Sequence, residues 1–188
     1  MRVVVGITGA SGVIYGITLL KALNDCRVET RLIISRQAEV ITALETSHSP
    51  ADIRALATHT YTEDEFIAPV ASGSFLHDGM VVAPCSMKTL AGIAAGYAEN
   101  LIQRAADVTV KEGRRLILLP RESPLSAIHL ENMLKLARMG VVIAPPVPAF
   151  YHRPETVSDL VDFTVGRLLD LLGLKNRPTY RWGETKEP

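Results

Sequence analysis

The stretch Arg2-Val3-Val4-Val5-Gly6-Ile7-Thr8-Gly9-Ala10-Ser11-Gly12 decides the fold. Its first seven residues are mostly β-branched and too few for a stable helix, so they predict a buried strand. After the glycines, residues 13–23 carry apolar side chains at helical spacing. A strand, a glycine turn and a helix form the first half of a mononucleotide-binding unit. Glycines let the backbone approach a ligand, and the free N–H groups at the helix start favour a phosphate.

The sequence lacks two features of dinucleotide-binding sites, and this narrows the kind of nucleotide that the turn could bind. The glycine spacing is G-x-x-G-x-x-G, whereas dinucleotide sites use G-x-G-x-x-G. They also need an acidic residue after the second strand, to hold the ribose. Here the second predicted strand, 28–34, ends in Ser35-Arg36, which argues against NAD and leaves NADP open through Arg36. No tyrosine has a lysine at the four-residue spacing that short-chain reductases need. The remaining candidate is flavin mononucleotide, FMN.

Composition sets the outer bounds. The 188 residues are 47% hydrophobic, which fits one domain with a sizeable core over 1–188 and a polar C-terminal tail from about 175. With 20 basic and 20 acidic residues, zero net charge argues against a nucleic-acid partner and predicts that other subunits cover part of the surface. No apolar run is long enough to span a membrane, and no C-x-x-C or H-x-x-x-H spacing predicts a metal site. Two isolated cysteines indicate a cytoplasmic protein with reduced thiols.

Strands and helices alternate along the chain, which predicts a parallel sheet covered by helices on both faces. We predict strands over 2–8, 28–34, 79–84, 115–119 and 141–144. Residues 58–78 show little periodicity and are predicted to form a loop. Helices are predicted over 13–23, 37–45 and 101–112, and a short one begins at the Ser49-Pro50 cap. Another follows the stretch 85–89 and ends at about 95. The last two run from Ser123-Pro124 to Gly140 and from a capping box at Thr156 to Gly173.

Polar residues follow the ends of the predicted strands, where ligands bind in such sheets. These groups are Gly9-Ala10-Ser11, Ser35, Ser86-Met87-Lys88-Thr89, Arg121-Glu122 and the stretch 149–153. Each alone has a simpler explanation, since turns favour Ser and Gly, and Ser86 or Thr89 can cap a helix. The charged pair Arg121-Glu122, directly after an apolar strand, needs a polar ligand or partner. We therefore expect the groups to converge on one rim.

Three further residues stand out. Arg104 and Lys111 lie seven residues apart on one face of a predicted helix, where a solvated basic surface is the simpler alternative. Trp182 lies in the polar tail, which has no core to fill. We expect it to pack on a neighbouring subunit or to close over a site.

Segments along nearly the whole chain resemble the flavin prenyltransferases, the UbiX-like proteins: Gly9–Gly12, Ser72–Ser74, Pro84–Leu90, Arg104–Val108, Lys111-Glu112, Pro120–Pro124, Pro148–Pro154 and Arg181–Gly183. The resemblance implies a Rossmann-like (flavodoxin-like), three-layer α/β/α subunit with a mostly parallel sheet, in a homododecamer. It implies an enzyme that joins the dimethylallyl group of dimethylallyl monophosphate to N5 and C6 of reduced FMN. The product, prenylated FMN, would serve a UbiD-type decarboxylase, in ubiquinone biosynthesis or aromatic-acid metabolism.

The resemblance also implies roles for single residues. Tyr151 and Arg167 would hold the dimethylallyl phosphate, helped by Arg104 and Lys111. Glu122 would act as an acid or base and Trp182 would wall the prenyl pocket, so that Ser11, Lys111, Glu122 and Trp182 form the expected catalytic set. The implied FMN contacts are Gly9, Ala10, Ser11, Ser35, Ser86, Met87, Lys88, Thr89 and Arg121.

The residue types suit this chemistry. Arginine and lysine stabilise the charge that builds on a departing phosphate, and an aromatic wall stabilises an allyl cation. A carboxylate can move the protons that ring closure requires. The chain has no D-D-x-x-D motif of the kind that binds magnesium in diphosphate-using prenyltransferases. We therefore expect a metal-independent reaction.

Two alternatives stay open. The FMN-dependent cysteine decarboxylases are similar at the glycine turn, but they carry P-A-S-A-N-T where this chain reads P-C-S-M-K-T over 84–89. Their P-x-M-N-x-x-M clamp is also absent from the corresponding stretch, 145–150. The second alternative is a non-catalytic flavin carrier for a partner decarboxylase. A carrier would return FMN unchanged, whereas the enzyme would release a heavier flavin.

Overall fold

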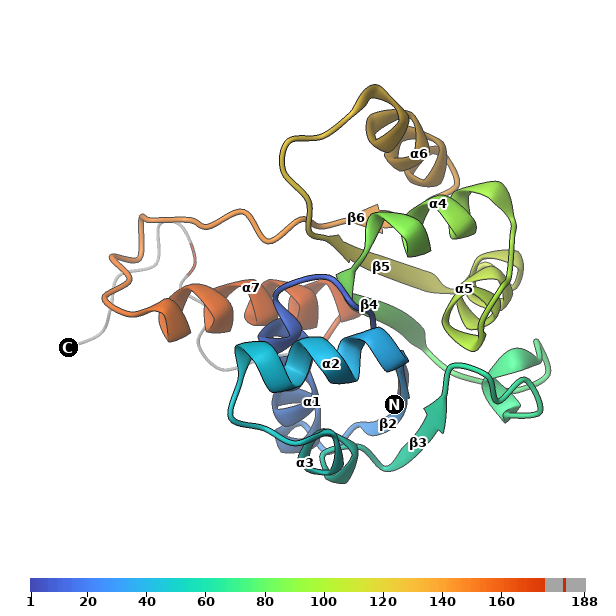
Figure 1. Cartoon of the computed structure of the whole chain (residues 1–188), viewed down its shortest axis with the longest axis horizontal. Helices are drawn as coiled ribbons and strands as arrows, with labels where there is room; N and C mark the ends of the chain where they lie inside the picture. Colours follow the sequence, from blue (N-terminus) through green and yellow to red (C-terminus); the bar gives the residue numbers. More distant parts are fainter. Residues whose placement is uncertain (175–180, 182–188) are drawn as a thin grey trace.

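The computed structural model describes residues 1–174 and 181. Within them the chain forms one parallel sheet flanked by helices (Figure 1). The strands are β1 (Arg2–Ile7), β2 (Glu29–Ile34), β3 (His59–Thr62), β4 (Gly79–Cys85), β5 (Arg115–Pro120) and β6 (Val142–Ile143). The helices are α1 (Val13–Asp25), α2 (Arg36–Glu45), α3 (Pro50–Ala55), α4 (Met87–Ala95), α5 (Leu101–Lys111), α6 (Ala127–Arg138) and α7 (Val157–Leu172), with a 3₁₀ turn, η1, at Pro69–Ala71.

The sheet order is β3-β2-β1-β4-β5-β6, and every neighbouring pair is parallel. The chain builds outward from β1 in one direction and then returns to add β4 on its other side. The gap between the ends of β1 and β4 is therefore the switch point of the sheet, where ligands bind in this type of fold.

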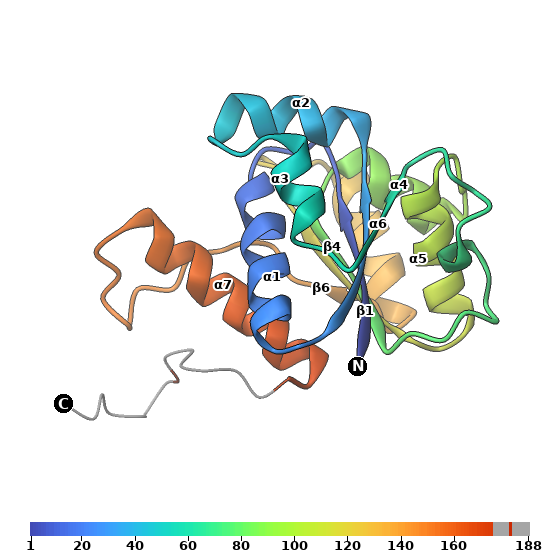
Figure 2. The same cartoon turned by 90° about the horizontal axis from the view of Figure 1, so that it is seen from below.

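Two apolar cores lie on opposite faces of the sheet. Val3, Val5 and Ile7 point to the face covered by α1, α3 and α7, whereas Val4 points to the face covered by α4, α5 and α6. This alternation follows from the two-residue period of a strand. Figure 2 shows the two helix layers on either side of the sheet. The three-layer α/β/α architecture expected from the sequence is confirmed.

The glycine turn fits the expected strand–turn–helix unit. Gly12 has φ 98°, a left-handed conformation that glycine adopts at low cost. Gly16 lies where α1 crosses the sheet. A methyl group on Gly16 would lie 2.8 Å from Cδ1 of Ile7 and still closer to the carbonyl oxygen of Ala83. The close packing of α1 on β1 and β4 therefore requires glycine here.

The helix caps read from the sequence are mostly confirmed. Ser49 with Asp52, and Thr156 with Asp159, form the two expected capping boxes. In each, the serine or threonine hydroxyl accepts the N–H three residues on, and the carboxylate accepts the N–H of the cap residue. Gly173 ends α7 in a left-handed conformation, as predicted, and Gly96 ends α4 in the same way.

Two expectations about the elements are wrong. The predicted loop 58–78 contains strand β3, an edge strand whose end residues His59 and Thr62 are exposed, so it shows no apolar alternation. The helix predicted to begin at Ser123-Pro124 begins instead after Ser126. There the hydroxyl of Ser126 accepts the N–H of His129, and Nδ1 of His129 accepts the N–H of Ser126.

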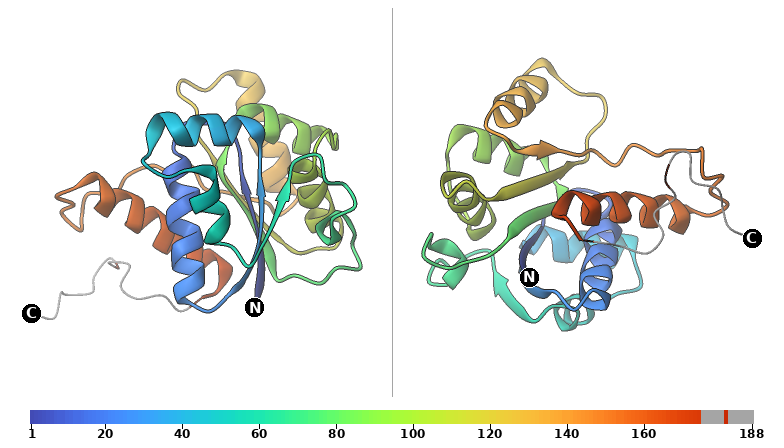
Figure 3. Two further views of the ribbon diagram at one scale, coloured as in Figure 1. Left: turned by 60° about the horizontal axis from the view of Figure 1, so that its bottom comes forward. Right: turned by 180° about the vertical axis from the view of Figure 1, so that it is seen from behind.

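The segment between β6 and α7 extends away from the sheet together with the first turns of α7 (Figure 3). Val157 and Phe150 on this arm are 77% and 67% exposed. None of the described helices is both long and apolar enough to cross a membrane.

Candidate active site

The ends of β1, β4 and β5 are tied together by hydrogen bonds. The Thr8 hydroxyl donates to the carbonyl of Pro84 (2.8 Å) and accepts the N–H of Ser86 (2.8 Å). The N–H of Arg121 donates to the carbonyl of Cys85 (3.3 Å). Three of the polar groups predicted from the sequence therefore lie at one edge of the sheet, at its switch point.

A cleft of about 330 Å³ opens at this edge. It is lined by Ser11, Gly12 and Tyr15 on one side and by Arg121 and Glu122 on another, with residues 145–147 completing the wall. Nε of Arg121 donates to the carbonyl oxygen of Ser11 (3.2 Å). The structure thus brings Ser11, Arg121 and Glu122 together, although 110 residues separate the first two.

Ser35 and Ser86 both act as helix caps here. The Ser35 hydroxyl accepts the N–H of Ala38 at the start of α2 (3.1 Å). The Ser86 hydroxyl accepts the N–H of Thr89 (3.3 Å) and donates to the Thr89 hydroxyl (3.0 Å) at the start of α4. These contacts agree with the simpler explanation, in which such serines are turn or cap residues. Both helix starts nevertheless point to the cleft edge of the sheet, where they can receive an anion.

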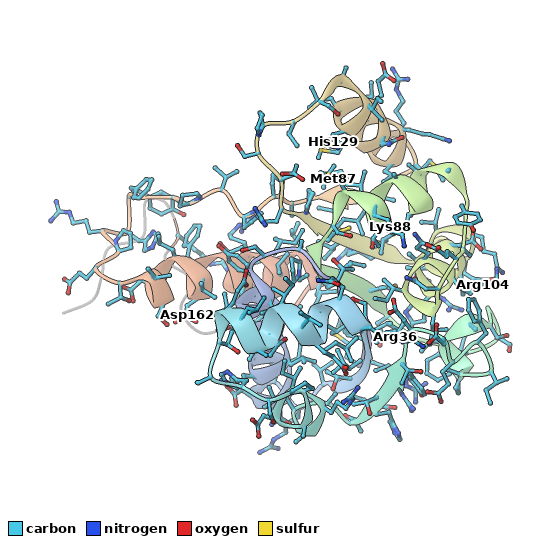
Figure 4. The ribbon with its side chains drawn as sticks, viewed as in Figure 1. Arg36, Met87, Lys88, Arg104, His129 and Asp162 are labelled. Carbon is cyan, nitrogen blue, oxygen red and sulfur yellow. The ribbon has the colours of Figure 1, made fainter. Side chains whose placement is uncertain are left out.

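Met87 and Lys88 occupy the first turn of α4 (Figure 4). Nζ of Lys88 forms an ion pair with Glu99 (2.9 Å), and the hydrogen bond to this carboxylate raises the pKa of Lys88. Lys88 is therefore a mostly exposed cation whose ammonium is directed to Glu99. Cys85, just before this turn, is fully buried, and burial raises the pKa of its thiol, which makes it a core residue rather than a nucleophile.

Sequence reasoning missed one residue at the glycine turn. Glu45, at the end of α2, accepts the N–H of Gly12 through Oε2 (2.8 Å). This puts a second carboxylate close to the cleft, besides that of Glu122. No sequence signal indicated it, because Glu45 follows no strand and looks like a solvated residue at a helix end.

Arg104 and Lys111 lie elsewhere, on α5. Nε of Arg104 donates to the carbonyl of Ala71 (3.1 Å), and its Nη1 pairs with Asp107 (2.8 Å). Lys111 pairs with Glu112, and this hydrogen bond lowers the pKa of the Glu112 carboxyl. Since α5 leads into the start of β5, Lys111 lies toward the edge of the sheet opposite the cleft. Arg104 lies in the first turn of the same helix, and neither residue lines the cleft of its own subunit.

Tyr151 lies on the extended arm, and Arg167 lies further along α7, among residues that pack into the core. The Tyr151 ring meets the Phe163 ring edge-on at 5.6 Å between centroids, and Arg167 lies one helical turn beyond Phe163 on α7. Nη1 of Arg167 pairs with Asp170 (2.7 Å), which also accepts from Arg181 (2.9 Å). Trp182 lies outside the described residues. Within residues 1–174 and 181, no cluster of His, Cys, Asp or Glu could hold a metal ion.

Comparison with known proteins gives a consistent result. The Flavoprotein family model matches residues 1–169. The flavin prenyltransferase UbiX of Methanocaldococcus jannaschii is 52% identical over 183 residues, covering 97% of this chain and 99% of that protein.

Two solved structures superpose closely. A protein of Escherichia coli O157:H7, described as a dodecameric FMN-dependent UbiX-like decarboxylase, has 54% identity and a TM-score of 0.96, covering 98% of this chain and all of the other. AnUbiX (PadA1), solved with FMN and dimethylallyl pyrophosphate, has 50% identity and a TM-score of 0.96, covering 98% of each chain. The chain therefore belongs to the Flavoprotein family and, within it, to the UbiX-like flavin prenyltransferases.

Proposed function

We propose that this chain binds reduced FMN at the cleft between β1, β4 and β5 and joins to it the dimethylallyl group of dimethylallyl phosphate. The observation that carries the proposal is the grouping of Ser11, Arg121 and Glu122 around one cleft at the switch point of the sheet. Membership of the flavin prenyltransferases supports the same chemistry.

The residues at the cleft fit a flavin mononucleotide. The left-handed Gly12 lets the chain turn without a side chain over the cleft, and the starts of α2 and α4 offer N–H groups and hydroxyls. The residues that would hold FMN are Gly9, Ala10, Ser11, Ser35, Ser86, Met87, Lys88, Thr89 and Arg121. Reduced flavin supplies the nucleophilic nitrogen and the ring carbon to which the dimethylallyl group becomes attached.

The carboxylates of Glu122 and Glu45 are the proton-handling groups of this proposal. Glu122 lines the cleft, and one of its oxygens accepts the N–H of Ser123 (3.0 Å), which leaves the other oxygen to hold or accept a proton. Glu45 contacts the glycine turn next to Ser11. Ser11 lines the same cleft, and we propose that its hydroxyl passes a proton between substrate and carboxylate.

The donor phosphate needs cations, and we propose that neighbouring subunits bring them together. None of the four residues proposed to bind the donor lines the cleft of its own subunit: Arg104, Lys111, Tyr151 and Arg167. The dodecameric relative supports this arrangement, as do exposed apolar side chains, including Ile67 (95% exposed) and Val157 (77% exposed). We propose a homododecamer in which each cleft is completed by residues of other subunits, with Trp182 walling the prenyl pocket.

Mixed oligomers test this sharing of sites. A Glu122→Gln variant and a Lys111→Ala variant, each of low activity alone, should gain activity when their subunits are mixed and exchanged. If two subunits form each site, some sites in the mixed oligomer will combine an intact Glu122 from one subunit with an intact Lys111 from another. Mixtures that stay inactive after proven subunit exchange would show that each site is built from one chain.

The wider setting is part of the proposal. Prenylated FMN would pass to a UbiD-type decarboxylase, which uses it as a cofactor. Cys26 and Cys85 are both free thiols, which fits a reducing cytoplasm.

The proposal is tested by following the leaving group. Under anaerobic conditions and with excess EDTA, protein and reduced FMN should release inorganic phosphate from dimethylallyl monophosphate. A parallel reaction with dimethylallyl pyrophosphate shows whether the site also accepts a diphosphate leaving group. Release without flavin would indicate a phosphatase, and release that requires magnesium would contradict the metal-independent reaction.

A further inference from the structure

The loop between η1 and β4 carries Ser72, Gly73 and Ser74 and is held by an arginine that the site described above does not include. Arg114, in the turn between α5 and β5, donates from Nη2 to the carbonyl of Gly73 (2.7 Å) and from Nη1 to that of Phe75 (2.8 Å). One guanidinium therefore fixes the two peptide carbonyls on either side of Ser74. A planar fork of donors can do this, whereas a single ammonium group cannot reach both in the same geometry.

The held loop lies directly against Lys111 and Glu112. A methyl group on Gly73 would be 2.8 Å from Nζ of Lys111 and still closer to Oε1 of Glu112. The backbone of Gly73 thus forms the surface on which the Lys111–Glu112 ion pair rests. Any shift of this loop changes where the Lys111 ammonium lies, or leaves room for it to move.

The far end of the loop is fixed independently. The Phe75 ring has the guanidinium carbon of Arg2 at 4.9 Å from its centroid and that of Arg31 at 5.3 Å, and it stacks with His77 at 6.3 Å. Ser72 and Ser74 instead hydrogen-bond to each other (2.9 Å). The clamp from Arg114 is therefore what ties residues 73–75 to the end of α5.

We infer that Arg114 is a positioning residue for the donor phosphate: it holds the Gly73 loop so that Lys111 is presented in a fixed place. The inference rests on the proposed function, in which Lys111 binds that phosphate. Arg114 is not among the residues proposed to bind either substrate. It acts through two carbonyls and the loop between them.

Variants of Arg114 and its neighbour separate this role from a general one. Arg114→Met removes both hydrogen bonds and keeps most of the apolar stem, and Arg114→Lys retains one bond at most. Arg115→Met is the matched control, because Arg115 is adjacent but donates to the carbonyl of Leu171 on α7 (2.5 Å). Gly73→Ala tests the same contact from the loop side, because its φ is not left-handed and the strain falls on Lys111 and Glu112.

The expected result is a split between kinetic constants. Loss of two charge-assisted hydrogen bonds in Arg114→Met should raise KM for dimethylallyl monophosphate about tenfold or more, with a smaller effect on kcat and none on FMN affinity. Arg114→Lys should recover part of the loss, and Gly73→Ala should raise the same KM. Arg115→Met should keep the wild-type KM. An unchanged donor KM in both Arg114→Met and Gly73→Ala would overturn the inference.

A second readout needs no catalysis. Amide hydrogen exchange of residues 72–76 should be faster in Arg114→Met than in Arg115→Met, with the strands of the sheet unchanged. Unchanged exchange would show that Arg114 does not hold the loop, and faster exchange with an unchanged donor KM would show that the loop does not position the donor. Wild-type protein that transfers no dimethylallyl group would overturn the proposed function itself. The wild-type reaction is run beside the variants so that the two failures are told apart.

Discussion

The packing of α1 on the sheet gives the sharpest stability prediction, through Gly16→Ala. The new methyl group would lie 2.8 Å from Cδ1 of Ile7 and closer still to the backbone oxygen of Ala83, so α1 or β4 must move. Forcing a methyl group into a packed core costs about 1–3 kcal/mol, and a clash with backbone belongs at the upper end. Alanine regains up to about 1 kcal/mol of helix propensity. The net loss is about 2 kcal/mol, or roughly 4–8 °C in Tm for a chain of this length.

Thermal unfolding followed by circular dichroism measures this loss, and Gly6→Ala is the control. A methyl group on Gly6 would meet only side chains, the nearest being Cγ2 of Ile102 at 3.1 Å, which can give way. We therefore expect a smaller drop in Tm for Gly6→Ala than for Gly16→Ala. Because α1 begins at the glycine turn, Gly16→Ala should also weaken FMN binding. A Gly16→Ala protein as stable as the wild type would refute the reasoning about this contact.

Three further outcomes are expected. Glu122→Gln should keep FMN affinity, measured by titration, and lower turnover about a hundredfold, since it removes a proton-transfer group; unchanged turnover would remove Glu122 from the mechanism. Arg167→Ala should raise the donor concentration needed for half-maximal rate and leave FMN affinity alone, and an effect on FMN instead would assign Arg167 to the flavin. The pKa of Asp159 is lowered by hydrogen bonds from the backbone N–H groups of Glu155 and Thr156. Its contribution to stability is therefore present above the ordinary carboxyl pKa and lost as pH falls through the lowered value. Asp159→Asn should destabilise the protein at neutral pH in urea unfolding, and the difference from wild type should shrink in acid; a difference independent of pH would contradict this.

The parts of the fold that could be predicted are the elements that a local sequence pattern specifies. The β-branched run before Gly9 and the capping box at Thr156 and Asp159 each predict an element whose bounds the structure confirms within a few residues. Strand β3 was missed because an exposed edge strand is held by main-chain bonds to β2 and needs no apolar alternation. The start of α6 was misplaced because Ser123 and Ser126 are both plausible caps, and only the contact with His129 selects between them.

The site was predictable to the extent that topology dictates it. Ser11, Arg121 and Glu122 follow parallel strands, so a parallel sheet must bring them to one edge, and the cleft lies there. Glu45 was missed because its contact with Gly12 depends on how α2 returns over the turn. The positions of Arg104 and Lys111 away from the cleft were also beyond a linear pattern. Spacing along a helix shows that two residues share a face, but not what that face meets.

The mass of the flavin tests the central proposal most directly. Reduced FMN and dimethylallyl monophosphate are incubated anaerobically with the protein and excess EDTA. The flavin is then released, and its mass is measured by mass spectrometry. The account predicts a flavin heavier than FMN by one dimethylallyl unit, formed by the wild type and strongly reduced in Glu122→Gln. Recovery of unmodified FMN from the wild type, or a heavier flavin only when magnesium is added, would contradict it.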